Sequence, residues 1–161
     1  MILFMEILIG MILFALIVVP GTARDPLGAI GDYPPAIRQR CIELGLIEDR
    51  KQRFTKKDLL RKGLAMILFA LLFAMILHHV NKIRGFREGF FTSYIIWLAI
   101  AWFDALVVDC LWFCHTGKVK IPGTEDMPEY KDYLFHIKQS CIGSLLGLPV
   151  CLIVGLLVTV I

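Results

Sequence analysis

Long apolar blocks separated by charged loops dominate the pattern of this 161-residue sequence. The four blocks cover about residues 2–19, 64–80, 90–114 and 141–161. Each is close to the roughly 20 apolar residues that an α-helix needs to cross a bilayer. The pattern therefore predicts an all-α fold, a four-helix transmembrane bundle that forms a single integral membrane domain over residues 1–161.

The two long polar loops contain helical patterns of their own. In the first loop, Ile37, Cys41 and Leu44 recur at helical spacing, which predicts a short amphipathic helix over residues 36–46 on the membrane surface. Apolar residues also recur along one side of residues 128–139 in the second long loop. The predicted bundle therefore carries short surface helices in its cytoplasmic loops.

Local signals predict where the long helices begin and end. Pro20-Gly21 should close the first helix, because proline lacks the amide hydrogen that a continuing helix needs. Thr55 and Asp58 are spaced as in a capping box and predict the start of the second long helix, after a solvated linker at residues 48–53. The first block lacks the basic start of a signal peptide, so we expect it to be retained.

The composition supports a membrane protein. Hydrophobic residues make up 58% of the chain and the mean hydropathy is +0.73, whereas a soluble domain is about half apolar. The net charge is only +3 and the basic residues do not form one stripe. We therefore expect the lipid bilayer, and no nucleic acid, as a partner. The five cysteines form no CxxC pair, so a disulfide framework is not expected.

The distribution of lysine and arginine predicts an orientation. With four spans, the first and third connections carry ten and four of these residues, and the short second connection carries three. The positive-inside rule then places both long loops in the cytoplasm and both termini outside, in the cell (inner) membrane.

Two carboxylates, Asp104 and Asp109, lie inside the third apolar block. Charges are costly within a membrane, so they mark an ion path, a working site or an ion pair with a neighbouring helix. On an α-helix, five residues correspond to a rotation of about 140°, so the two side chains should lie on different faces. We therefore expect two sites: Asp104 in an ion path or interior pair, and Asp109 near the cytoplasmic interface.

Further acidic and histidine residues follow near the same interface. Asp109, Glu125, Asp126 and His136 are candidate catalytic residues, because carboxylates and imidazoles serve as general acids and bases. The acidic groups could also hold a divalent cation. For the loop residues Glu125 and Asp126, a solvated acidic turn is the competing interpretation.

Cys110, Cys114 and His115 are weak candidates for metal ligands. One helical turn separates the two cysteines, so both could reach one ion, but their spacing fits no familiar zinc motif. Cysteine is also a common small buried residue. The sequence therefore identifies no cofactor.

Small residues recur every four positions in the last block, at Gly143, Gly147, Cys151 and Gly155. Such a stripe allows another helix to approach closely. It predicts a helix–helix partner, either a second copy of this chain or another membrane subunit.

A series of short motifs runs through the second half of the chain: Trp102-Phe103-Asp104, Asp109, Pro122-Gly123-Thr124-Glu125, Asp132-Tyr133 and His136, before a glycine-rich last block. With these motifs the chain resembles a family of small bacterial multi-pass integral membrane proteins. The resemblance implies a multi-pass membrane protein and brings no activity with it.

Three functions are compatible with these features. The leading hypothesis is a small membrane protein that acts through helix packing, as a homo-oligomer or as a subunit of a complex. The second is a membrane-embedded enzyme acting on a lipid-like or phosphorylated substrate at the cytoplasmic face. The third is a proton- or cation-coupled transporter that uses Asp104. No nucleotide-binding loop or familiar catalytic motif decides whether the chain is an enzyme.

Overall fold

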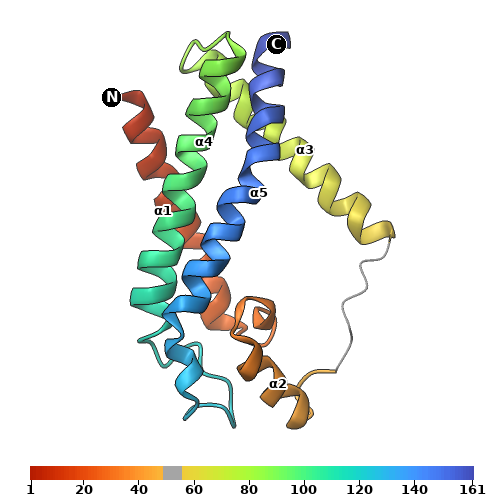
Figure 1. Cartoon of the computed structure of the whole chain (residues 1–161), viewed down its shortest axis with the longest axis vertical. Coiled ribbons are helices and arrows are strands. Elements are labelled where there is room, and N and C mark those ends of the chain that lie inside the picture. The colour runs from red at the N-terminus through yellow and green to blue at the C-terminus, as the bar shows by residue number, and fades with distance from the viewer. Residues whose placement is uncertain (49–55) are drawn as a thin grey trace. The chain divides into compact units, whose positions relative to one another are not determined.

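The computed structural model describes residues 1–48 and 56–161, and in these residues the chain is helical and contains no strand. The predicted linker at residues 49–53 and the proposed cap at Thr55 lie outside the described residues. The α-helices are α1 (Ile2–Arg24), α2 (Pro35–Glu43), α3 (Lys56–His79), α4 (Phe86–Phe103) and α5 (Tyr133–Val160) (Figure 1). The predicted all-α fold with four long helices is confirmed.

Within the described residues, three helical stretches are long and apolar enough to cross a membrane. They are α1, α5 and Phe86–Phe113, which joins α4 to a π-helix, η2 (Asp104–Phe113). These stretches match three of the predicted spans and confirm the membrane class. The fourth predicted span lies in α3, whose apolar part, Gly63–His79, is shorter.

The end of the first helix was predicted wrongly. Helix α1 does not stop at Pro20 but continues to Arg24. The amide of Asp25 still donates to the carbonyl oxygen of Gly21 at 3.1 Å. A proline removes one backbone donor, but the amides that follow it keep their partners one turn back, so an apolar helix can pass through it.

The described chain divides into two compact units. Unit 1 comprises Met1–Gly10, Gln52–Ala101 and Ile142–Ile161, and unit 2 comprises Met11–Lys51 and Trp102–Cys141. Helices α1 and α5 contribute residues to each unit, so a unit is not a continuous segment of sequence.

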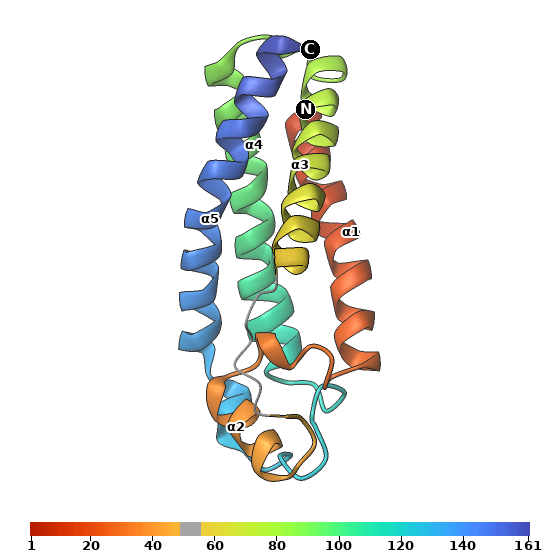
Figure 2. The same cartoon turned by 90° about the vertical axis from the view of Figure 1, so that its right-hand side faces the viewer.

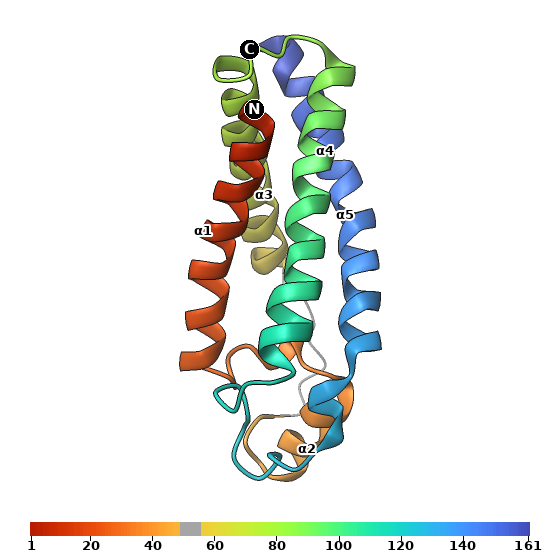
Figure 3. The same cartoon turned by 90° about the vertical axis from the view of Figure 1, so that its left-hand side faces the viewer.

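Unit 1 is built by close packing of long helices. Its buried residues come from α3, α4 and α5: Ala70, Ala74, Leu77, Ile96, Val154 and Val158. In this unit α4 and α5 run side by side, as Figures 2 and 3 show from opposite sides. The two chain termini and the connection between α3 and α4 lie at the same end of the unit, as expected for four helices in alternating directions.

Part of the predicted stripe of small residues lies at the contact between α4 and α5, but Gly143 does not, because nothing lies within 4 Å of a methyl group built on it. A methyl group built on Gly155 would lie 3.0 Å from the carbonyl oxygen of Phe86, and one built on Gly89 would lie 3.3 Å from the α-carbon of Gly155. Gly147 packs directly against the indole of Trp97, and Cys151 is fully buried. The stripe therefore serves helix packing, and the helix that it contacts belongs to the same chain.

Unit 2 has an apolar core made largely of loop residues. The buried members are Tyr33, Ile37, Cys41, Phe113, Cys114, Val119, Ile121 and Tyr130. Helix α2 forms at the predicted place but ends at Glu43, earlier than residue 46. Ile37 and Cys41 are fully buried in this core, where residues of the second long loop cover them, whereas Leu44 is exposed.

Hydrogen bonds hold the two long loops of unit 2 together. The hydroxyl of Tyr33 donates to the carbonyl oxygen of Val119 at 2.9 Å. In the second loop, the hydroxyl of Thr124 donates to the carbonyl oxygen of Ile121 at 2.8 Å and lies 2.7 Å from the hydroxyl of Tyr130. The helix predicted at residues 128–139 is a 3₁₀ turn, η3 (Pro128–Lys131), followed by the start of α5.

Candidate functional site

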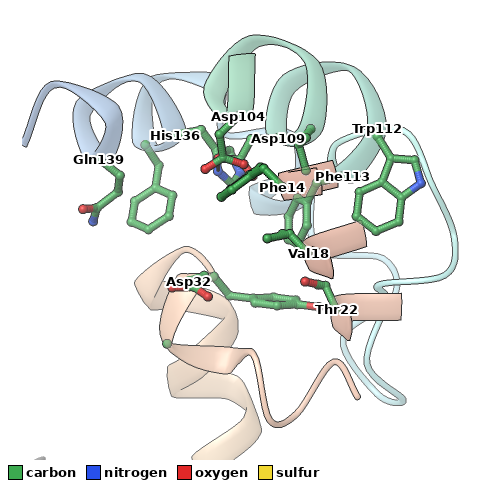
Figure 4. Close-up of a pocket in the computed structure, with 14 residues that line it drawn as sticks. Phe14, Val18, Thr22, Asp32, Asp104, Asp109, Trp112, Phe113, His136 and Gln139 are labelled. Carbon is green, nitrogen blue, oxygen red and sulfur yellow. Dashed lines mark ion pairs between the residues drawn. The ribbon is translucent and has the colours of Figure 1, made fainter. Parts of the chain in front are cut away.

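A cavity of about 300 Å³ lies within unit 2 (Figure 4). Its ionisable lining residues are Asp32, Asp104, Asp109, His136 and Tyr33. Its apolar wall is formed mainly by Phe14, Val18, Val108, Trp112, Phe113 and Phe135. The cavity thus combines several acidic groups with an aromatic surface.

The π-helix η2 places both intramembrane carboxylates at this cavity. In a π-helix each amide bonds to the carbonyl five residues earlier, and the amide of Cys114 does so with Asp109 at 2.9 Å. Residues five apart therefore lie nearly one above the other. The prediction that Asp104 and Asp109 point in different directions is wrong, because it assumed the tighter α-helical turn.

The lining residues of η2 follow the wider turn. They are Asp104, Val108, Asp109, Trp112 and Phe113, which lie four or five positions apart along the chain. On an α-helix this set would spread over about half of the circumference. The π-helix gathers it on one face. Leu111 and His115, which an α-helix would place beside Asp104, are exposed and outside the lining.

Asp109 and His136 form a direct pair. Nδ1 of His136 lies 3.1 Å from Oδ2 of Asp109, and the histidine side chain is only 3% exposed. The ring of His136 also packs edge-on against Phe113. Nε2 of His136 is buried and has no hydrogen-bond partner among the described residues. The pair can hold a proton between a carboxylate and an imidazole, as general acid–base chemistry and proton relays require.

A third carboxylate, Asp32, approaches the cavity from the first long loop. It belongs to the 3₁₀ turn η1 (Ile30–Asp32), and Figure 4 places it across the cavity from Asp104 and Asp109. Partial burial, and then the negative charge of Asp109, raise the pKa of the Asp32 carboxyl above its ordinary value of 3.8. Sequence reasoning missed Asp32, because no local signal shows that this loop folds back against η2.

The cavity has an excess of negative charge. Three carboxylates and one histidine line it, and the lining contains no lysine or arginine within the described part of the chain. Carboxylates that lie close together without matched cations favour the uptake of protons or of positively charged groups. The same charge repels phosphates.

The other two catalytic candidates lie elsewhere. Glu125 accepts a hydrogen bond from the amide of Gly123 at 2.8 Å, and its carbonyl oxygen accepts one from Lys120 at 2.6 Å. Asp126 is exposed in the same turn. Neither residue lines the cavity. The structure thus brings Asp109 and His136 together and leaves Glu125 and Asp126 in a solvated acidic turn.

The weak metal candidates do not form a binding site. Among the described residues, no group of three or more His, Cys, Asp or Glu side chains is placed to hold a metal ion. Cys114 is instead a buried member of the apolar core of unit 2. His115 instead pairs with the hydroxyl of Tyr133, at 3.1 Å.

No family model, curated protein or solved structure matches this chain. The resemblance to small bacterial multi-pass membrane proteins therefore stays a prediction.

Proposed function

We propose that the protein is a small proton-coupled membrane carrier whose cation-binding site is the acidic cavity of unit 2. The observation that carries this proposal is the convergence of Asp32, Asp104 and Asp109 with His136 on one cavity. Protons and other cations compete for the same carboxylates, because either can neutralise them. Such competition couples the binding of a cation to the release of protons.

The proposed carrier lies in the inner membrane of a bacterial cell, with both long loops in the cytoplasm. The loops hold fourteen of the 17 lysine and arginine residues, which supports this orientation through the positive-inside rule. The common core of the two loops in unit 2 supports placing them on the same side. In this arrangement α3 supplies the fourth span.

Four spans are few for a carrier, so the proposal includes association of more than one copy. The small-residue stripe of α5 does not supply that interface, because Gly147 and Gly155 contact α4 of the same chain. This contact also weakens the hypothesis of a protein that acts only through packing of the stripe.

A second candidate function is a membrane-embedded enzyme that uses the pair of Asp109 and His136 as a general base. The 3.1 Å separation of the pair favours it. A phosphorylated substrate is disfavoured, because the cavity offers carboxylates and no basic side chain among its described lining residues. Chemistry on a neutral or cationic substrate would fit the same geometry.

Proton movement in liposomes tests the carrier. Purified protein is reconstituted with a pH-sensitive dye inside acidic liposomes, and the membrane potential is clamped with potassium and valinomycin. Sodium, tetramethylammonium and benzyltrimethylammonium salts are then added outside. We expect at least one of them to drive proton efflux above that of protein-free liposomes.

The variants Asp104→Asn and Asp109→Asn should abolish this efflux, because each removes a carboxylate that both ions need. Asp126→Asn removes an exposed carboxylate outside the cavity and should leave the efflux unchanged. If no cation moves protons, or if Asp109→Asn is as active as the unmodified protein, the carrier proposal is wrong.

A further inference from the structure

We infer that the cation bound in the cavity is an organic ammonium ion with an apolar body. This inference rests on the proposed function and names its substrate class. A bare metal ion and a phosphorylated compound are the alternatives that it excludes. Three features of the cavity carry it: the placement of the acidic groups, the aromatic wall and a buried histidine with an unpartnered nitrogen.

The acidic groups lie on opposite walls. Asp104 and Asp109 belong to η2, whereas Asp32 comes from the first long loop and lies across the cavity in Figure 4. A metal ion needs several ligand atoms at about 2.0–2.6 Å. The described side chains form no such group. Separated carboxylates instead suit a larger cation, whose charge is spread over several atoms.

The remaining wall is apolar and aromatic. Phe14 and Val18 of α1, Trp112 of η2 and Phe135 of α5 all border the cavity. Such a surface gains about 25 cal/mol for each Å² of apolar ligand area removed from water. An indole or phenyl face also attracts an ammonium group, most strongly when the site excludes water. A hydrated inorganic cation would use none of this wall.

His136 shows that the cavity keeps a polar group without a full set of partners. Its side chain is 3% exposed and Nδ1 is paired with Asp109, but Nε2 has no hydrogen-bond partner among the described residues. A buried imidazole nitrogen in this state lowers stability. Such a group calls for a physical explanation, and a catalytic role is one of those found in proteins. Through Nδ1, the same ring holds Asp109 at the cavity wall, so His136 orients a carboxylate that faces the bound cation.

Equilibrium binding to the purified full chain tests the inference. The probes are benzyltrimethylammonium, tetramethylammonium, manganese(II) and neopentylbenzene, which has the shape of benzyltrimethylammonium without its charge. Binding is measured by titration calorimetry in detergent, with empty micelles subtracted. We expect benzyltrimethylammonium to bind at least about tenfold more tightly than tetramethylammonium, because only the former uses the apolar wall. It should also bind at least about tenfold more tightly than neopentylbenzene, because only the cation gains from the carboxylates.

Matched variants separate the contribution of the carboxylates from that of the aromatic wall. Asp104→Asn and Asp32→Asn should each weaken benzyltrimethylammonium at least about fivefold and leave neopentylbenzene unchanged. Trp112→Leu should weaken the aromatic cation by about two- to tenfold, in line with a cation–π contact. Trp102→Leu is the control, because Trp102 is exposed and does not line the cavity. Because Asp32 lies in a loop, its variant tests the charge without altering η2.

Several results would overturn the inference. Tighter binding of manganese(II) than of benzyltrimethylammonium would identify a metal site, and equal binding of neopentylbenzene would identify an uncharged apolar slot. Absence of benzyltrimethylammonium binding, with sodium-driven proton efflux intact, would reject the substrate class and leave the carrier standing. Binding of benzyltrimethylammonium without proton efflux for any cation would reject the carrier and retain the ligand class.

Discussion

Unit 1 and unit 2 use helices in opposite ways. In unit 1, glycines remove side-chain volume, so that Gly89 and Gly155 bring α4 and α5 almost into backbone contact. In unit 2, the wider turn of η2 and two long loops leave a cavity of about 300 Å³. Long apolar helices therefore pack closely in one unit and line a cavity in the other.

The polar groups of the two units differ in the same way. In unit 1, the side-chain amide of Asn81 donates to Glu6 at 2.9 Å, and a guanidinium nitrogen of Arg84 lies 3.1 Å from Nδ1 of His78. There, the acidic group is bonded to an amide and lies at no open cavity, although Oε1 of Glu6 and Oδ1 of Asn81 have no hydrogen-bond partner among the described residues. In unit 2, Asp104 and Asp32 face another carboxylate across a cavity. Unbalanced charge next to open space is the property expected of a functional site.

The largest expected effect tests whether the loops of unit 2 form a true core. Ile37→Ala should lower the free energy of unfolding by about 2–5 kcal/mol, because it leaves a void at a fully buried position. Leu46→Ala, at an exposed position, is the control and should cost much less. Thermal unfolding in detergent measures both. Similar small losses for the two variants would mean that unit 2 lacks the core described for it.

A second, smaller effect tests the close packing of unit 1. Gly155→Val should lower the free energy of unfolding by about 1–3 kcal/mol, because the added side chain meets the backbone of Phe86 and Phe90. Gly143→Val is the matched control in the same helix, since nothing lies within 4 Å of its built methyl group. Denaturant titration in detergent measures the difference. Equal losses would show that helix propensity, and not contact with α4, sets the cost.

The smallest expected effect concerns the charge of the cavity. Because the pKa of Asp32 is raised above 3.8 in the folded protein, the folded state holds this proton more tightly than the unfolded state. The contribution of Asp32 to stability therefore falls as the pH rises from about 3.8 through the raised value. Asp32→Asn has no carboxyl to titrate and so does not lose this stability. The melting temperature of the variant, relative to that of the unmodified protein, should therefore rise as the pH increases over this range.

The difference between the two melting temperatures, measured from pH 4 to pH 8, checks this prediction. Asp126→Asn provides the control, because that carboxylate lies outside the cavity. If the difference in melting temperature between Asp32→Asn and the unmodified protein stays constant with pH, ionising the Asp32 carboxyl does not destabilise the folded state.

Much of the fold could be predicted because it depends on local patterns. Apolar blocks of membrane length predict helices wherever they fold, and the spacing of Ile37 and Cys41 predicts α2. The stripe at Gly147 and Gly155 predicts a close helix contact. None of these patterns shows which surface packs against the apolar or small residues. The stripe was expected to meet another molecule, and the apolar side of α2 was expected to meet lipid.

The candidate site could be predicted only in part. Asp109 and His136 were singled out as acid–base residues near one interface, and they form a pair. Glu125 and Asp126 share the predicted interface with them, but the turn that contains these two acids does not line the cavity. Asp32 was overlooked, since its role depends on a contact between segments more than 70 positions apart.

The amino-acid sequence alone predicts the class of this protein and its available chemistry: apolar helices of membrane length, a stripe of small residues and carboxylates within an apolar block. Only the folded structure shows where those carboxylates lie. The apolar pattern predicts a helix but does not show whether its hydrogen bonds span four residues or five. In η2 that replacement turns Asp104 and Asp109 from two separate charges into one wall of a single cavity.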